Sequence, residues 1–222
     1  MANKTKRITC LALALVLLLS LSAGTVFAAP AENAGSFRDT TGHPYASYIA
    51  RAVELGLFSG FEDGTFRPDA TVTRGQFVTV LWRMMKSPES TAEVPFTDIG
   101  TLNASFRKAI AWAYENNVVS GTTETTFNPG GTISRQQALT ILYRLDGQRS
   151  GMETLFAELY RRSIVDFSDI SSYAKNGMLW AIYNDIAVLE DGNKLLPGGG
   201  CSRALLSVFL VKYLDEYKDR VM

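Results

Sequence analysis

The chain has 222 residues with 22 Lys plus Arg, 22 Asp plus Glu and one His, so its formal net charge is zero. Three basic residues precede residue 8; without them 19 basic and 22 acidic residues remain, a net charge of about −3 that argues against general nucleic-acid binding. The single histidine, His43, cannot form a His-based metal site or a catalytic triad. The sequence has no metal-ligand cluster or phosphate-binding loop either, so no cofactor is expected.

The first 28 residues are predicted to be a secretory signal peptide. Three basic residues precede an uncharged stretch, residues 8–21, which is short for the alternative of a membrane anchor, and residues 26–28 form a small-residue cleavage site. We therefore expect a secreted chain with no membrane span after cleavage at Ala28. The mature chain keeps one cysteine, Cys201, so no internal disulfide is expected, and Cys201 is interpreted as a small buried apolar residue.

A short pattern recurs three times and predicts three comparable units. Each copy has a proline, four further residues, then Thr or Ser followed by Arg: Pro68…Thr73-Arg74, Pro129…Ser134-Arg135 and Pro197…Ser202-Arg203. A Phe-x-Asp opening and a helical stretch come before each proline. We predict units at residues 37–86, 96–146 and 167–217, and a linker at 147–166 that carries an additional amphipathic helix.

The elements follow the same order within each unit. In the first unit we expect a helix from Tyr45 to Leu55, then a turn and a short strand that end at Pro68, then the helix that begins with the arginine. The second unit repeats this order. The third unit is the most divergent, because it lacks the turn glycine that Gly60 and Gly121 supply in the other two.

The helix that follows each arginine has a start signal and an apolar face. Thr73…Gln76 and Ser134…Gln137 fit the capping box, whereas Ser202…Leu205 keeps only the hydroxyl half. Positions 3, 7 and 10 after each arginine are apolar in all three units: Phe77, Leu81 and Met84; Ala138, Leu142 and Leu145; Leu206, Leu210 and Tyr213. We predict a mainly α fold in which three tandem repeats form a pseudo-threefold spindle, with a central three-helix bundle, peripheral helices and very short strands.

Each arginine is predicted to be the first residue of its helix, where unpaired backbone N–H groups carry a partial positive charge. A cation there is mildly unfavourable, so its threefold occurrence favours a nearby anion, and arginine with helix N–H donors suits a carboxylate or phosphate. The alternative is an internal salt bridge from each arginine to the aspartate of an opening, namely Asp39, Asp98 or Asp169. These aspartates could instead cap the first helix of each unit.

The units resemble S-layer homology domains. The resemblance covers about residues 37–217 and rests on residues 55–68 and Val72-Thr73-Arg74 in the first unit, and on Phe96-Thr97-Asp98-Ile99, Thr126-Phe127-Asn128-Pro129 and Ile133-Ser134-Arg135 in the second. It implies a noncatalytic wall-anchoring module whose grooves between repeats bind an acidic cell-wall glycan, often one with a pyruvate ketal. A threefold match of this kind is a strong signal.

The resemblance also implies a set of glycan-binding residues. By position these are Arg74, Arg135 and Arg203; Asp39, Asp98 and Asp169; and Gly60 and Gly121. The aromatic position of the family falls on Pro44 beside Tyr45, on Ser105 beside Phe106, and on Tyr173, so we include Tyr45 and Tyr173. A sugar face stacks on an aromatic ring, and these departures from the family pattern predict fewer than three competent grooves.

The leading hypothesis is therefore an exported, noncatalytic cell-wall-anchoring protein at the cell surface. It would bind an acidic, pyruvylated secondary cell-wall polysaccharide, and peptidoglycan or other surface proteins are further candidate partners. The alternative is a structural or adaptor protein of the cell envelope whose grooves and linker helix bind partner proteins. A glycan-cleaving enzyme needs two carboxylates that flank a bond, and the pairs Glu62-Asp63 and Glu190-Asp191 are instead typical turn residues.

Overall fold

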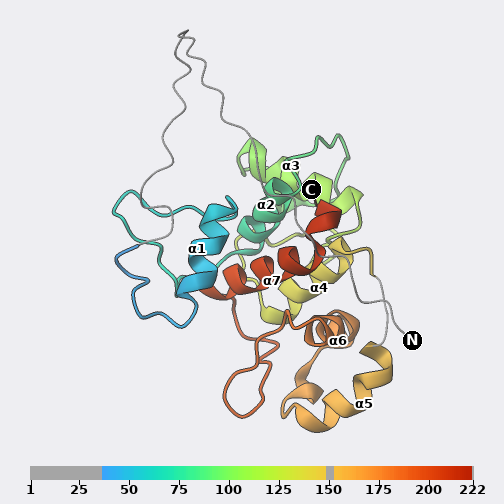
Figure 1. Cartoon of the computed structure of the whole chain (residues 1–222). Helices are drawn as coiled ribbons and strands as arrows, with labels where there is room; N and C mark the ends of the chain where they lie inside the picture. Colours follow the sequence, from blue (N-terminus) through green and yellow to red (C-terminus); the bar gives the residue numbers. More distant parts are fainter. Residues whose placement is uncertain (1–36, 149–152, 222) are drawn as a thin grey trace, which may run out of the picture. The chain divides into compact units, whose positions relative to one another are not determined.

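The computed structural model describes residues 37–148 and 153–221, so the predicted signal peptide lies outside the described residues. Within the described part the fold is mainly helical, as predicted (Figure 1). The α-helices are α1 (Ala46–Glu54), α2 (Arg74–Met84), α3 (Ala104–Glu115), α4 (Arg135–Leu145), α5 (Glu153–Ser163), α6 (Lys175–Tyr183) and α7 (Arg203–Val221). Three short 3-10 helices accompany them: η1 (Thr97–Ile99), η2 (Phe167–Asp169) and η3 (Ser172–Ala174). None of these helices has the length and apolar character that crossing a bilayer requires.

A ring of three backbone hydrogen bonds joins the units. The N–H of Val72 donates to the carbonyl of Cys201 (3.0 Å), that of Cys201 to Ile133 (2.9 Å), and that of Ile133 to Val72 (3.0 Å). Each of these residues lies two positions before the arginine of its unit. Among the described residues, strand-like pairing between units consists of single antiparallel bridges: Thr71 with Ser202, Thr73 with Thr132, and Ser134 with Gly200. The described residues contain no strand at the expected positions before the prolines, and the bridges between units lie after each proline.

The main helix pairs form between units in a cyclic order. Helix α2 of the first unit packs against α3 of the second, α4 of the second against α6 of the third, and α7 of the third against α1 of the first (Figure 1). Helix α5 lies where an additional helix is expected and packs against α6. Each unit therefore buries its arginine helix on the next unit rather than on its own first helix. The central three-helix bundle stays a prediction.

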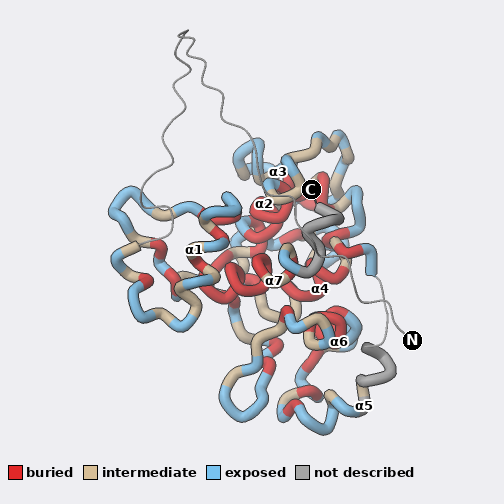
Figure 2. Tube along the Cα trace, in the orientation of Figure 1, coloured by how far each residue is buried: buried red, intermediate tan, exposed pale blue. Residues whose placement is uncertain are grey.

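The helix starts and the apolar face agree with the sequence patterns. Thr73 and Ser134 each form a complete capping box, and the hydroxyl of Ser202 accepts from the N–H of Leu205 at 3.2 Å. The side chains at positions 3 and 7 after each arginine are fully buried, and Figure 2 shows buried stretches along α2, α4 and α7. Cys201 is also fully buried, in agreement with its interpretation as an apolar core residue.

Candidate functional site

The opening aspartates hold the short extended segment before each proline. The carboxylate of Asp39 accepts hydrogen bonds from the N–H groups of Phe66 (2.8 Å) and Arg67 (2.7 Å), and Asp98 makes the equivalent pair in the second unit at 2.9 and 2.7 Å. Partial desolvation raises the pKa of Asp39, but the backbone hydrogen bonds outweigh it and leave the pKa below its ordinary value. Both sequence-based alternatives are wrong for these two residues, since among the described contacts they neither cap the first helix nor pair with an arginine.

In the third unit this role belongs to Asp166. Its carboxylate accepts from the N–H groups of Leu195 and Leu196, both at 2.8 Å. The third opening therefore lies three residues before the predicted one, and Asp169, which accepts only a long bond of 3.4 Å from Ser168 in the described contacts, is not the positional equivalent of Asp39. The sequence pattern missed this register because the opening Phe is replaced by Ile164, directly after the inserted helix α5.

The two turn glycines are required by close contact with a phenylalanine ring. A Cβ atom on Gly60 would collide with the Phe37 ring, and one on Gly121 would collide with the Phe96 ring and with neighbouring backbone oxygens. Leu189 takes this position in the third unit, where Ile164 replaces the phenylalanine. The glycine and the phenylalanine that it faces in the first two units are thus both replaced in the third.

The arginines bind the unit that follows their own. The guanidinium of Arg74 donates from Nε to the carbonyl of Phe127 (3.1 Å) and from Nη2 to that of Ser120 (2.6 Å). Arg203 donates in the same way to Phe66 (2.8 Å) and Ser59 (2.7 Å) of the first unit. These bonds give the repeated arginine a structural role, in which it fixes the turn of one unit against the helix start of another.

The N–H groups at the helix starts are also used between units. The N–H of Arg74 donates to the carbonyl of Gly131 (2.8 Å) and that of Gly75 to Pro129 (2.9 Å), and α4 and α7 begin with equivalent pairs of bonds. The expectation that these backbone donors would bind an anion is therefore wrong. An anion at these sites would need donors other than the N–H groups at the helix starts.

Arg135 departs from the other two arginines. Its Nη2 donates to Oε1 of Glu190 at 2.5 Å, and its Nη1 reaches the carbonyl of Leu195 only at 3.5 Å. Its Nε is buried and has no hydrogen-bond partner among the described residues. Leaving such a donor unpaired costs about 1–3 kcal/mol. Arg135 thus forms an ion pair with Glu190 in place of the bond from Nε to a backbone carbonyl that Arg74 and Arg203 make.

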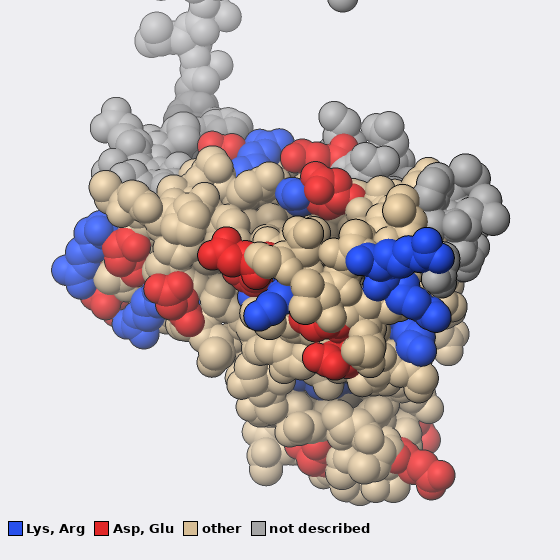
Figure 3. Space-filling view, turned by 90° about the horizontal axis from the view of Figure 1, so that it is seen from below, with Lys and Arg blue, Asp and Glu red and all other residues tan. Residues whose placement is uncertain are grey.

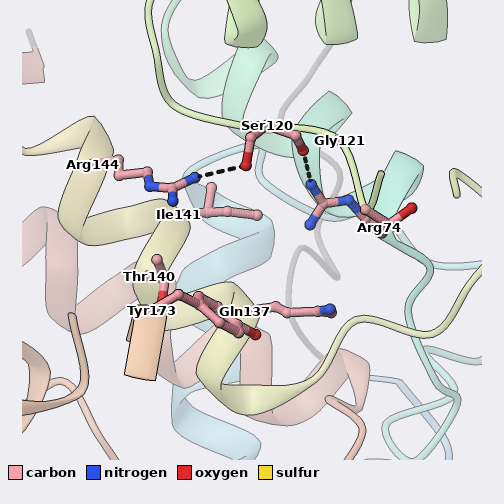
Figure 4. Close-up of a pocket in the computed structure, with 9 residues that line it drawn as sticks. Arg74, Ser120, Gly121, Gln137, Thr140, Ile141, Arg144 and Tyr173 are labelled. Atoms are coloured by element: carbon pink, nitrogen blue, oxygen red, sulfur yellow. Dashed lines mark hydrogen bonds between the residues drawn. The ribbon is translucent and has the colours of Figure 1, made fainter. Parts of the chain in front are cut away.

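A cavity of about 360 Å³ lies beside Arg74 and combines residues of all three units. Arg74 comes from the first unit and Tyr173 from the third, while the second supplies the rest of the lining: Ser120, Gly121, Thr122, Gln137, Thr140, Ile141 and Arg144. Figure 4 shows Arg74 and Arg144 on either side of Ser120, with Arg144 Nη1 3.4 Å from the Ser120 hydroxyl, and Tyr173 across the space from them. None of the nine lining residues is acidic. We call this cavity the Arg74 groove.

The Arg74 groove is positively charged, and its Arg74 guanidinium is partly removed from water. Burial lowers the pKa of Arg74 to about 10, with Tyr173 opposing and Arg144 adding to this shift, so the guanidinium stays charged at neutral pH. Burial also raises the pKa of Tyr173, so its phenol stays neutral. On the face that Figure 3 shows, Lys and Arg lie beside Asp and Glu in several places and gather in one cluster at an edge. The Arg74 groove suits one carboxylate beside an apolar sugar face.

Sequence reasoning missed Arg144. It lies nine residues after Arg135 on α4, and the lining residues of that helix, 137, 140, 141 and 144, follow helical i, i+3, i+4, i+7 spacing. A search of the helix face that starts at Gln137 would have found it. The repeated pattern did not identify Arg144, because the pattern ends at the start of the helix.

The other two arginines have different surroundings. Arg135, Glu190 and Tyr45 line a second cavity of about 330 Å³, which we call the Arg135 groove. Arg203 lies over the rings of Phe58, Phe61 and Phe66, at 5.1, 5.0 and 4.4 Å from their centroids. Each aromatic candidate therefore meets the arginine of another unit: Tyr173 joins Arg74, and Tyr45 joins Arg135.

Comparison with known proteins agrees with the repeat pattern. The S-layer homology domain model matches residues 36–78 and 95–139. These two segments are S-layer homology domains. The matched residues include the openings of the first two units and the helix starts at Arg74 and Arg135. The third unit lies outside the matched residues, but it makes the same hydrogen bonds around Asp166 and at the start of α7.

Three relatives illustrate the proteins in which such segments occur. The chain is 29% identical over 154 residues to cell surface glycoprotein 1 of Acetivibrio thermocellus, 31% over 146 residues to an endoglucanase of a Bacillus species, and 28% over 115 residues to a cellulosome-anchoring protein of A. thermocellus. The alignments cover 63%, 66% and 49% of this chain. They span only 6%, 15% and 25% of the relatives, so this chain matches one region of larger proteins.

Proposed function

We propose that the chain is an exported, noncatalytic module that anchors at the cell surface by binding an acidic secondary cell-wall polysaccharide. The observation that carries the proposal is the Arg74 groove, which brings two arginines and a tyrosine together in a lining without a carboxylate. The two S-layer homology domains support a location at the cell surface, and relatives named as a cell surface glycoprotein and a cellulosome-anchoring protein support an anchoring role.

The chemistry of the groove fits a sugar that carries a carboxylate, such as a pyruvate ketal. The carboxylate would bind the planar guanidinium of Arg74, with Arg144 as the second cation. The sugar face would stack on Tyr173, which is half exposed, and the hydroxyl groups would bind polar side chains such as Gln137. Asp98 would act indirectly, because its hydrogen bonds hold the segment whose carbonyl, that of Phe127, orients Arg74.

The first test is retention of the mature chain, residues 29–222, by purified cell-wall sacculi before and after acid removal of the attached polysaccharide. We expect retention to fall to background once the polysaccharide is removed. Retention that survives this treatment would contradict the proposal and favour peptidoglycan or a partner protein, as in the adaptor alternative.

A matched pair of variants tests the groove itself. Arg144→Gln removes the second cation and should weaken retention by about tenfold, the size expected for one charge-assisted contact. Arg51→Gln is the control, because Arg51 is a half-exposed cation on α1 that lines neither the Arg74 groove nor the Arg135 groove. Equal effects of the two changes would mean that retention depends on total charge and not on this groove.

A further inference from the structure

Position 190 is the positional equivalent of position 122 in the Arg74 groove. The N–H groups of Thr122 and Glu190 each donate to the carbonyl of the residue four positions later, Thr126 and Lys194, at 2.8 Å. The residue at this position therefore stands beside the arginine of the preceding unit in both grooves. In the Arg74 groove it is a neutral hydroxyl, and in the Arg135 groove it is a carboxylate.

We propose that Glu190 is a built-in anion that closes the Arg135 groove to acidic ligands and so makes the Arg74 groove the anion-binding groove of this pair. Its Oε1 lies 2.5 Å from Nη2 of Arg135, and the Arg135 side chain is only 12% exposed. This inference rests on the proposed function, because it assumes that the ligand presents a carboxylate to the arginine.

The third-unit positions equivalent to the lining of the Arg74 groove have also changed. Of these, Leu205 lines the Arg135 groove, whereas Val188, Leu189, Val208 and Lys212 line another cavity, which shares Tyr45 with it. Lys212 stands nine residues after Arg203, as Arg144 stands nine after Arg135, and it is paired with Asp185 at 3.0 Å. Four polar or small residues of the Arg74 groove become apolar at the equivalent positions: Ser120 becomes Val188, Gly121 Leu189, Gln137 Leu205, and Thr140 Val208. In the Arg135 groove the arginine itself is paired with Glu190, and Asp69 adds a second carboxylate to the lining.

An internal carboxylate has a large advantage over a free ligand. Glu190 is held on a tight turn beside Arg135, so its effective concentration at the guanidinium is far above that of a glycan in solution. An acidic ligand would have to displace Glu190 from Arg135. The partly buried carboxylate of Glu190 would then lie next to the carboxylate of the ligand, and the two negative charges would repel each other. Closure therefore needs no movement of the backbone.

The first experiment places an equivalent carboxylate in the Arg74 groove. Thr122→Glu places a carboxylate at the equivalent position beside Arg74, and Thr122→Gln is the size-matched neutral variant; Thr122 is exposed, so neither change disturbs the core. In the sacculus assay, Thr122→Glu should weaken retention at least about tenfold more than Thr122→Gln does. Equal retention of the two variants would overturn the inference.

The second experiment opens the closed groove in the Thr122→Glu background. Leu205→Gln, which completes the half capping box at Ser202, is compared with Leu205→Gln combined with Glu190→Thr, so the two proteins differ only at position 190. Thermal unfolding first checks that both are folded. We expect the combined variant to recover retention by about threefold or more; no recovery overturns the inference. If the wild-type chain is not retained through the polysaccharide, it is the proposed function that fails.

Discussion

Arg74, Arg135 and Arg203 occupy one helical position, yet each has a different environment. Arg74 lines an open cavity without acidic residues, Arg135 is paired with Glu190, and Arg203 lies over three phenylalanine rings. Since the helix start is the same in all three, the differences come from single residues on the turn of the following unit. The chemistry of each groove is therefore decided one residue at a time.

The contact between Gly60 and Phe37 gives a prediction at this scale. Gly60→Ala should lower the free energy of unfolding by about 1–3 kcal/mol, because the added Cβ meets the Phe37 ring. In a Phe37→Ile background, which imitates Ile164 of the third unit, the same change should cost at least about 1 kcal/mol less. Urea unfolding of the four proteins of this double-mutant cycle measures both values.

The cycle would contradict the close-contact explanation if Gly60→Ala were equally costly in both backgrounds. In that case the cost would not come from the ring, and since the φ of Gly60 lies outside the left-handed region it would not come from that conformation either. Gly64, whose φ of +74° lies in the left-handed region with open space around it, gives the comparison: Gly64→Ala should cost the same with Phe or Ile at 37.

At the scale of elements, the units are joined at the helix starts. Val72, Ile133 and Cys201 form a closed ring of backbone hydrogen bonds, and the first N–H groups of α2, α4 and α7 donate to carbonyls of a neighbouring unit. The chain therefore satisfies its helix N-termini with backbone from another repeat. This use of the donors binds the repeats together and removes them from ligand binding.

The buried thiol in this ring predicts a loss of stability at high pH. Burial raises the pKa of Cys201 to about 12, and Arg135 opposes this only in part, whereas an unfolded cysteine has a pKa of about 8.5. The folded state therefore holds the proton more tightly, so its contribution to stability is complete below about pH 8.5 and is lost progressively as the pH rises toward 12.

Cys201→Val, which copies the residue of the first unit at position 72, removes this contribution. The variant should match the wild type at pH 7 to within about 1 kcal/mol and be more stable than it by about 1–2 kcal/mol at pH 10. Chemical denaturation at the two pH values measures the difference, and parallel pH profiles for the two proteins would show that the thiol is not the group responsible.

At the scale of the whole molecule, the cyclic helix pairs make the units interdependent. Because α7 of the last unit packs against α1 of the first, the loss of any one unit leaves each of the other two with one unpaired helix. Each unit contains one buried tryptophan, Trp82, Trp112 or Trp180, so unfolding can be followed unit by unit. We expect single-tryptophan variants to report the same urea midpoint.

A core substitution in one unit should then lower the unfolding midpoint of all three units. Ile49→Ala in α1 should cost about 2–5 kcal/mol and shift the midpoint equally for the three tryptophan reporters. Leu159→Ala on the exposed face of α5 is the control, with an expected effect below about 0.5 kcal/mol. A midpoint at Trp112 that stays in place while the others move would show that the second unit folds independently.

The sequence by itself determined the features that depend on local periodicity and local capping. It predicted the helices that begin at Arg74, Arg135 and Arg203, their buried faces and the capping boxes, because hydroxyl caps and apolar spacing act within one helix. It also identified Arg74, from the repeat, and Tyr173, from the resemblance to the family, as candidates. The sequence did not show which groups form hydrogen bonds or ion pairs with these side chains.

Only the tertiary structure decided those partners. Its hydrogen bonds show that Asp166 belongs to the third opening. The N–H groups at the helix starts and the guanidinium groups donate to carbonyls of another unit, and Arg144 lines the Arg74 groove. The tertiary structure also placed Glu190 against Arg135 across 55 residues of sequence. The physical reason is that hydrogen bonds and ion pairs depend on proximity in space, and in a cyclic fold the neighbours of each repeat belong to the next one.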